Sequence, residues 1–406
     1  MSQPIYMDSH ATTPLDPRVL EAMMPYLTDH FGNAASSTHL FGEHAKSAVD
    51  AARRQVADLI GCSEEEIIFT SGATESDNLA VKGVAYQYRD RGNHIITSTV
   101  EHHAVLDSCE ALEESGFDVT YLPVDKYGMV QPQQVEDAIT DQTALISLIY
   151  VNGEVGTINP ITEMGEIAEK YGILFHSDAT QGIGKVESDV DELKVDLMSF
   201  TAHKMYGPKG IGALYVRQKN PPIQLYPLLH GGGQENNIRS GTLNVPGIVG
   251  FGAACELCKQ EVEEETKRIT ALREQLYHGL SKQINLIHLN GHPTKRLPGN
   301  LNLSFEFVES QSILLGLEEI ALSSGSACNS DSVEPSYVLR AMGIKDELAL
   351  SAIRFGLGRH NTAAEVDTVV ECIVSQVTRL REMSPLYEMA QSGNYEAAIP
   401  ANGETS

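Results

Sequence analysis

Residues 196–216 read DLMSFTAHKMYGPKGIGALYV, which is two short, largely apolar runs with a lysine between them. The runs cover residues 196–200 and 212–216. Short apolar runs that do not alternate with polar residues are typical of strands buried on both faces of a mostly parallel sheet. Lys204 comes soon after the first run, so we expect its amine to lie near the end of a buried strand.

Five further runs of this kind precede the segment, with helical patterns between them. In residues 45–60 apolar side chains recur at i, i+3 and i+4, as in an amphipathic helix, and Gly61 follows where a left-handed cap would end it. This alternation predicts an α/β fold with a large, mostly parallel, seven-stranded sheet. The five further runs are residues 67–70, 94–97, 119–122, 144–151 and 173–176.

A change of pattern in the last third of the chain predicts a smaller α+β domain. A long helical pattern spans residues 246–283, and a strand at 300–307 and a helix at 310–317 follow it. The last helix opens with Thr362 and Glu365, which have the spacing of a capping box. We therefore divide the chain into four parts: an N-terminal arm that joins the small domain (1–15), a large domain (16–260), the small domain (261–390) and a tail expected to be flexible (391–406).

The composition limits the classes of partner. The 406 residues include 55 Asp and Glu against 29 Lys and Arg, and the net charge of -26 repels nucleic acid and anionic membrane surfaces. This acidity serves solubility or, alternatively, attracts basic partner proteins. We find no signal sequence and no run of roughly 20 apolar residues, and six cysteines without dense spacing fit a reducing compartment. We expect a cytoplasmic protein without direct nucleic-acid or membrane partners.

Lys204 is a candidate for chemistry because Thr201 and His203 closely precede it. An amine desolvated at the end of a buried strand stays partly neutral, as an imine-forming nucleophile must. A lysine taken alone would more often be an ordinary surface residue. Three other polar segments favour the chemical interpretation.

Each of these segments also follows a predicted strand. Residues 70–76, TSGATES, form a strand-to-helix turn whose free N–H groups can bind a phosphate beside the Thr74 hydroxyl. Asp178 can hold a pyridine nitrogen protonated; a metal pair with His176 is the alternative, but no further ligands stand at zinc-like spacing. His102 can stack on an aromatic cofactor and exchange protons, although a lone histidine is more often structural.

With these residues in this order, the chain resembles the class V, fold-type I enzymes that use pyridoxal 5′-phosphate (PLP), and within them the cysteine desulfurases of the IscS/NifS group. The resemblance runs nearly end to end and implies the fold-type I architecture and a homodimer with shared active sites. The motifs that carry it are residues 6–8, 11–14, 31–33, 70–78, 178–181, 203–204, 206–210, 230–233, 239–242, 323–328, 334–337 and 353–355.

The resemblance also implies how the cofactor is held. Lys204 would form the internal aldimine and later move the substrate's α-proton, through quinonoid and ketimine intermediates. Asp178 would pair with the pyridinium nitrogen, Gln181 would bond the ring hydroxyl, and His102 would stack on the ring. The residues expected around the phosphate are Ala73, Thr74, Thr201 and His203, together with Thr242 of the partner subunit.

For the substrate, L-cysteine, the resemblance implies that Arg354, with Asn33, holds the carboxylate, a task that suits a guanidinium fork. Cys328 lies in a small-residue loop that we expect to be mobile and exposed, where a thiol can ionise. Its thiolate would attack the substrate sulfur, keep it as a persulfide and release L-alanine.

The persulfide sulfur would pass to an acceptor protein such as an iron–sulfur scaffold. Iron–sulfur assembly, tRNA thiolation and nitrogenase maturation stay open, as does a transient cluster ligand role for Cys328; no resident metal is expected.

The other cysteines have a structural interpretation. Burial as small hydrophobic side chains is expected for Cys62, Cys109 and Cys372, and core packing on a helix for Cys255 and Cys258.

Four positions depart from the family pattern. Gly153 stands where a second Asn is usual, so Gln181 alone or water would bond the ring hydroxyl, and Ala34 replaces a usual proline. Asn329 and Asp331 stand where small or hydroxyl residues are commoner, so acceptor preference could differ.

Two rival functions remain: another PLP enzyme of this fold, such as a selenocysteine lyase or an aminotransferase, and a non-catalytic binding module.

Overall fold

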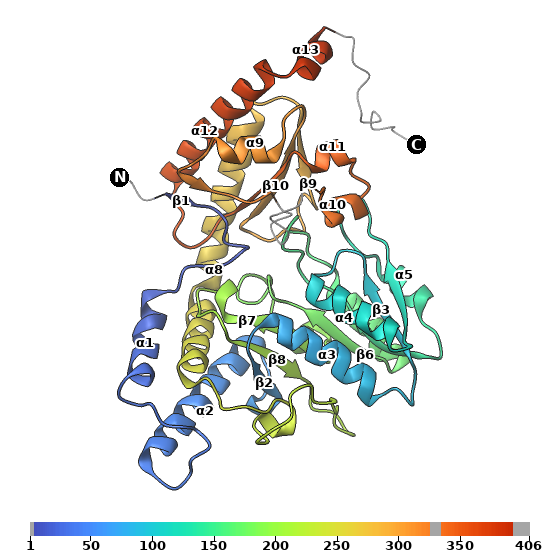
Figure 1. Ribbon diagram of the computed structural model, residues 1–406, viewed down its shortest axis with the longest axis vertical. Helices are drawn as coiled ribbons and strands as arrows, with labels where there is room; N and C mark the ends of the chain where they lie inside the picture. Colours follow the sequence, from blue (N-terminus) through green and yellow to red (C-terminus); the bar gives the residue numbers. More distant parts are fainter. Residues whose placement is uncertain (1–3, 325–333, 393–406) are drawn as a thin grey trace.

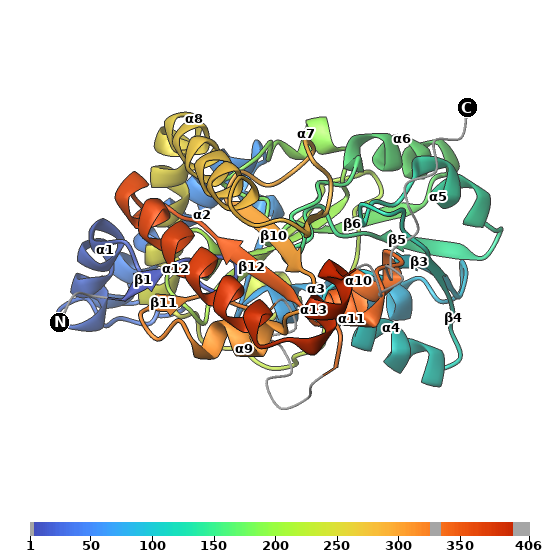
Figure 2. The same cartoon turned by 90° about the horizontal axis from the view of Figure 1, so that it is seen from above.

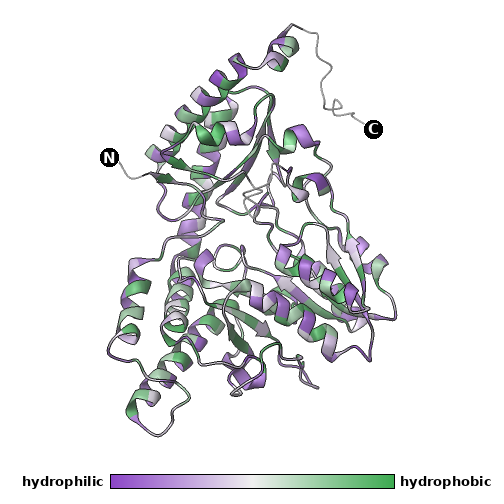
Figure 3. Ribbon diagram, in the orientation of Figure 1, coloured by the Kyte–Doolittle hydropathy of each residue, from purple (hydrophilic) through white to green (hydrophobic). Residues whose placement is uncertain are grey.

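The structure is a computed structural model that describes residues 4–324 and 334–392. Two bodies lie one above the other, and the long helix α8 (Val245–Ser281) runs through both (Figure 1). The lower body contains the seven-stranded sheet, and the upper body contains a three-stranded sheet. Hydrophobic and hydrophilic residues are interspersed along the helices of both bodies, as in amphipathic helices (Figure 3).

The large sheet has the strand order β2-β8-β7-β6-β5-β3-β4. The four pairs from β7 to β4 are parallel, and only β8 runs antiparallel to its neighbours β7 and β2. The prediction of a large, mostly parallel, seven-stranded sheet is therefore confirmed. The strands are β2 (Ile67–Thr70), β3 (His94–Ser98), β4 (Asp118–Leu122), β5 (Thr143–Ser147), β6 (Leu174–Asp178), β7 (Leu197–Thr201) and β8 (Gly212–Val216).

Helices cover both faces of this sheet because its strands are apolar on both sides. On one face Phe175, Met198 and Tyr215 share a core with the helices α2 (Leu40–Ile60), α6 (Ile161–Tyr171) and the first half of α8. On the other face Ile95, Leu145 and Leu197 pack against α3 (Ala73–Gln87) and α4 (His103–Glu114). The remaining helices of this body are α1 (Pro17–Leu27), α5 (Pro132–Ala138) and α7 (Val190–Leu193).

The upper body has a core of its own. Its antiparallel sheet has the order β12-β10-β9, and the second half of α8 and the helix α12 (Ala363–Glu382) pack side by side against it (Figure 2). The N-terminal arm reaches this body because β1 (Ile5–Tyr6) pairs with β11 (Ile320–Ala321). The other elements are β9 (Ile287–Asn290), β10 (Asn300–Phe305), β12 (Ala352–Gly356), α9 (Ser310–Leu315), α10 (Tyr337–Ala341), α11 (Asp346–Ala349) and α13 (Pro385–Gln391).

Local end signals behave as the sequence predicts. Gly61 caps α2 in the left-handed conformation with φ 71, and Thr362 and Glu365 form the capping box of α12. The strand expected at 144–151 ends earlier, at Ser147, although the N–H groups of Leu148 and Tyr150 still donate to carbonyls of β6. The proposed domain limits stay a prediction, since the limit at 260/261 falls inside the continuous helix α8.

The cysteines outside the Cys328 loop are not equally buried. Cys109, Cys255 and Cys258 are buried, as expected, whereas Cys62 and Cys372 are half-buried and pack against the edges of the cores, so the expectation of burial holds only in part for these two. Cys62 follows the cap of α2 and Cys372 lies on α12, and both positions leave part of the side chain open to solvent. Across residues 4–324 and 334–392, every helix is too short or too polar to cross a bilayer.

Candidate active site

An open cleft of about 490 Å³ lies where the strands β6 and β7 end and the helices α3 and α4 begin. In a parallel sheet these strand ends meet helix N-termini at one edge, which is where α/β proteins bind ligands. Eight of the predicted site residues line it: Ala73, Thr74, His102, Asp178, Gln181, Thr201, His203 and Lys204.

The start of α3 forms one end of the cleft. Gly72 caps this helix with φ 155 and no side-chain cap, and among the described residues the N–H groups of Ala73, Thr74 and Glu75 find no protein acceptor. A Cβ on Gly212 of β8 would lie 2.7 Å from the Gly72 Cα, so a glycine pair lets the strand and the turn pack closely. Three free donors at a helix N-terminus form an anion site.

Two predicted anion contacts are already engaged with protein groups. The Thr201 hydroxyl donates to the Ile211 carbonyl oxygen at 2.9 Å, so its oxygen can still accept but its proton is in use. The His203 Nδ1 lies 3.1 Å from the Thr12 hydroxyl. Burial, and then the charges of Lys204, Lys209 and Lys185, lower the pKa of His203 to about 4, so its imidazole is neutral at physiological pH.

The lining residues that were not singled out from the sequence include Glu75, Thr180 and Lys209. Lys209 adds a positive charge at the anion end, and its place in the motif of residues 206–210 was the available signal. Although burial alone would raise it, hydrogen bonds from Arg239 and Ser71 hold the pKa of Glu75 below its usual range. Glu75 therefore fixes the loop that carries Arg239 against the turn.

Lys204 sits on the 3-10 turn that follows β7. Its Nζ donates to the carbonyl oxygens of His10 at 2.6 Å and Ala11 at 2.8 Å, both in the N-terminal arm. Burial, followed by the nearby charges of Lys185 and Arg354, lowers the pKa of this amine to about 8. A substantial neutral fraction is therefore present near neutral pH, as imine formation requires.

Asp178 ends β6 and is 4% exposed. Its Oδ1 accepts the N–H of Thr180 at 2.9 Å. Beside it the Gln181 Nε2 donates to the His10 carbonyl at 2.9 Å, while the Gln181 Oε1 and the Thr180 Oγ1 are buried without a partner in the described part of the chain. His102 is exposed to the cleft and caps α4, with its Nδ1 accepting the Ala104 N–H at 3.1 Å.

The cleft has a matching group for each polar part of PLP. The free N–H groups of α3 suit its phosphate, the buried Asp178 carboxylate suits a protonated ring nitrogen, and the Lys204 amine suits its aldehyde. The two buried, unpartnered oxygens of Gln181 and Thr180 lie where a ring hydroxyl could bond to them. The residues present therefore fit the cofactor.

Three predicted residues of the described part of the chain do not line the cleft. Asn33 is exposed and its Oδ1 accepts the Ala35 N–H, and Thr242 is exposed in the loop before α8. Arg354 lies on β12 and donates to the Gly153 carbonyl at 3.2 Å and to Asp8 at 2.9 Å. Cys328 lies outside the described residues, as do Asn329 and Asp331.

The departure at Gly153 has a packing consequence. A Cβ at this position would lie 3.0 Å from the Gln181 Nε2 and 3.1 Å from its Cγ, closer than ordinary contacts. Gln181 occupies the space that a side chain at 153 would need. We therefore expect Gln181, helped by Thr180, to bond the ring hydroxyl here without a second amide.

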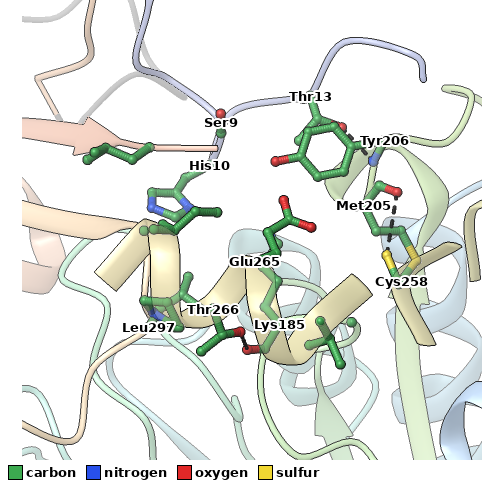
Figure 4. A pocket seen from close by; sticks show the side chains of 16 residues that line it. Ser9, His10, Thr13, Lys185, Met205, Tyr206, Cys258, Glu265, Thr266 and Leu297 are labelled. Atoms are coloured by element: carbon green, nitrogen blue, oxygen red, sulfur yellow. Dashed lines mark hydrogen bonds between the residues drawn. The ribbon is translucent and has the colours of Figure 1, made fainter. Parts of the chain in front are cut away.

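A second cavity, of about 30 Å³, lies on the other side of the arm (Figure 4). Ser9, His10 and Tyr206 face α8 residues Cys258 and Glu265 across it. A space of this size holds one water molecule, so it is too small for an amino acid substrate.

Three known proteins illustrate what the chain is similar to. The aminotransferase class-V family matches residues 5–369. The cysteine desulfurase IscS of Anaeromyxobacter sp. (strain Fw109-5) is 56% identical over 393 residues, which are 97% of each chain. A solved NifS-like protein is 38% identical with a TM-score of 0.86, covering 93% of this chain and 100% of its own. The solved SspA in complex with cysteine is 40% identical with a TM-score of 0.78, covering 88% of this chain and 100% of its own.

Proposed function

The chain belongs to the aminotransferase class-V family and is a PLP-dependent cysteine desulfurase, and from this premise we propose which residues convert L-cysteine to L-alanine and remove the sulfur. The rival functions of an aminotransferase, a selenocysteine lyase and a non-catalytic scaffold predict different products from L-cysteine. The residue roles below rest on the geometry of the cleft. Each is a proposal for this chain.

PLP, when bound, supplies a ring that withdraws electrons from the substrate's Cα. Lys204 attaches the cofactor covalently, and Asp178 holds its ring nitrogen protonated. Gln181 and Thr180 bond the ring hydroxyl, and His102 stacks on the ring. The phosphate would bind to the free N–H groups at the start of α3 and to Thr74, Thr201 and His203.

Arg354 binds the substrate carboxylate. Its side chain is 9% exposed, and its guanidinium is held by the Gly153 carbonyl and the Asp8 carboxylate, while its Nε is buried without a partner among the described residues. A guanidinium oriented in this way offers fixed donors to a carboxylate. Asn33 assists it when the loop at residues 31–36 lies over the site.

Lys204 moves the proton of the substrate's Cα. Its free amine donates to the His10 and Ala11 carbonyls, which hold it without neutralising it. Carbonyl acceptors leave the amine able to take or give a proton, whereas a carboxylate partner would favour the charged form. The arm therefore keeps the lysine within reach of the cleft.

Cys328 receives the sulfur. Its thiolate attacks the sulfur of the substrate, so that an S–S bond forms as the substrate's C–S bond breaks, and the bonding electrons leave with carbon, which then takes a proton to become L-alanine. The persulfide passes to an acceptor protein, and we propose iron–sulfur cluster assembly as its use, with tRNA thiolation as the second. The enzyme works in the cytoplasm, supported by the free cysteines of the described residues.

The assembly is a homodimer. Thr242 is exposed and does not line the cleft of its own chain, which suits a contribution to the phosphate of the second active site. The apolar side chains of Phe31, Leu40 and Phe41 are exposed at the lower end of the molecule, and we propose that the second subunit covers them.

The observation that carries the function is the buried Lys204 amine in one cleft with Asp178 and the free helix N-terminus. The test gives purified enzyme L-cysteine and a reductant and measures products. We expect sulfide and alanine in equal amounts; pyruvate with ammonia would contradict the proposal. Borohydride reduction followed by peptide mapping should find the PLP adduct on Lys204.

Replacement of the sulfur-accepting thiol separates the two halves of the reaction. Cys328→Ala should abolish persulfide while leaving the yellow cofactor bound, because the cofactor residues do not include Cys328. Cys372→Ala, at a half-buried thiol on α12, is the matched control and should keep the persulfide. Persulfide found on the Cys328→Ala protein would assign sulfur transfer to another thiol.

A further inference from the structure

Asp77 lies behind the cleft on the second turn of α3 and has no part in the roles above. Its side chain is 1% exposed, and both carboxylate oxygens are buried without a well-formed hydrogen bond in the part of the chain that the structure describes. A bare carboxylate in such a place is costly, so its state needs an explanation.

The neighbours of Asp77 cannot neutralise it. The imidazole of His176, on β6, approaches its Oδ1 at 3.7 Å, but burial lowers the pKa of His176 to about 3. That ring is held by hydroxyls, with Nδ1 2.8 Å from Ser147 and Nε2 2.9 Å from Ser199. His176 is therefore a neutral neighbour, and no Lys or Arg of the described residues forms an ion pair with Asp77.

The other titratable groups that face Asp77 are carboxyls. Burial first, then the charge of Asp178 and, more weakly, that of Glu101 raise the pKa of Asp77 well above its usual range, although the Ser199 hydroxyl acts in the opposite direction. Burial also raises the pKa of Glu101 to about 8, although the Ser98 hydroxyl and the Ile149 N–H bond to it. The free energy needed to ionise two adjacent buried carboxyls at once is high, so the carboxyls that lack strong hydrogen-bond donors keep their protons.

We propose that Asp77 is a positioning residue that stays protonated at neutral pH and thereby leaves the negative charge beneath the cofactor ring to Asp178. This inference rests on the proposed function of Asp178 as partner of the ring nitrogen. A charged Asp77 would repel the charge on Asp178 and favour protonation of that carboxyl, which would remove the charge that keeps the ring nitrogen protonated.

The sign of the pH effect follows from the proton count. An acid whose pKa is higher in the folded state binds more protons there, so its stabilising effect is complete below the unfolded pKa of about 3.9 and is lost as pH rises toward the folded pKa. Asp77→Asn removes this dependence. The ratio of the unfolding constants, wild type over variant, should rise about tenfold per pH unit from pH 5 to 7.

The experiment uses urea unfolding of the cofactor-free full chain between pH 5 and 8.5. Glu110→Gln, an exposed acid on α4, is the matched control and should show a flat ratio. Asp77→Ser provides a second neutral variant should the Asn variant not fold. A flat ratio for both Asp77 variants would mean that Asp77 is ionised in the folded protein and would overturn the proposal.

A double-mutant comparison tests whether the ionisation of Asp77 depends on the charge of Asp178. In an Asp178→Asn background the repelling charge is gone, so Asp77 should ionise at lower pH and the rise of the ratio should end earlier. The same rise with and without Asp178 would show that the two carboxyls are not coupled, which also overturns the proposal.

If the proposed role of Asp178 itself is wrong, the experiments give a different result. If Asp178→Asn enzyme binds added PLP with the affinity and absorption spectrum of the wild type, the role of Asp178 is wrong whatever the unfolding data show. If Asp178→Asn loses the wild-type spectrum while the Asp77 ratio stays flat, only the proposal about Asp77 fails.

Discussion

The open cleft around Lys204 and the closed cavity around Lys185 meet at His10, and their two lysines differ in access rather than in pKa. Burial is the first cause that lowers the pKa of each amine to about 8. Lys204 donates to two backbone carbonyls and opens into about 490 Å³, whereas the Lys185 Nζ is buried without a partner in the described chain beside about 30 Å³. A lowered pKa therefore marks a reactive lysine only where a substrate can reach it.

The largest expected effect separates the two lysines by activity. Lys204→Arg should lower kcat at least about a thousandfold, because a guanidinium neither forms the cofactor linkage nor moves the Cα proton. Alanine formation from L-cysteine is the measurement, and Lys259→Arg, on the exposed face of α8, is the control. An equal loss from Lys185→Met would break the comparison, since it would give the enclosed amine an equal share in the chemistry.

A smaller effect concerns stability. Because the pKa of Lys185 is lower in the folded protein than the usual 10.4, the unfolded chain binds more protons, and the amine destabilises the fold increasingly below pH 10.4 and fully below about pH 8. Lys185→Met should therefore raise the free energy of unfolding at pH 7 by up to about 3 kcal/mol. This gain should vanish above pH 10.5. Urea unfolding at both pH values checks it, and a gain that does not change with pH would point to packing instead.

The smallest effect joins the two regions. The charge of Lys185 is the second cause, after burial, that lowers the pKa of Lys204, so Lys185→Met should raise the pKa of Lys204. Cofactor-free variant protein should then need a higher pH than the wild type to capture added PLP at a given rate. Lys185→Arg, which keeps the charge, should restore the wild-type profile. Identical profiles for Met and wild type would show that the cavity and the cleft are electrostatically separate.

The sequence predicted the elements of the cleft well and their contacts less well. The turn at residues 70–76, the strand end at Asp178 and the lysine after β7 all follow from patterns of a few neighbouring residues, and all line one cleft. Glu75, Thr180 and Lys209 lie inside the motifs at residues 70–78, 178–181 and 206–210, but the sequence alone did not separate them from the other polar residues there. Asn33 was expected at the substrate, and in this chain it is exposed outside the cleft.

The sequence by itself determined the seven-stranded sheet, the helix ends at Gly61 and Thr362, and the family, because periodicity and caps act over a few residues and are written in order along the chain. Only the tertiary structure decided that the Lys204 amine rests on the His10 carbonyl, 194 residues away, that Arg354 pairs with Asp8, and that Asp77 lies bare behind Asp178. These contacts depend on which strand ends and which arm meet in space, and burial then sets the proton affinity of each group.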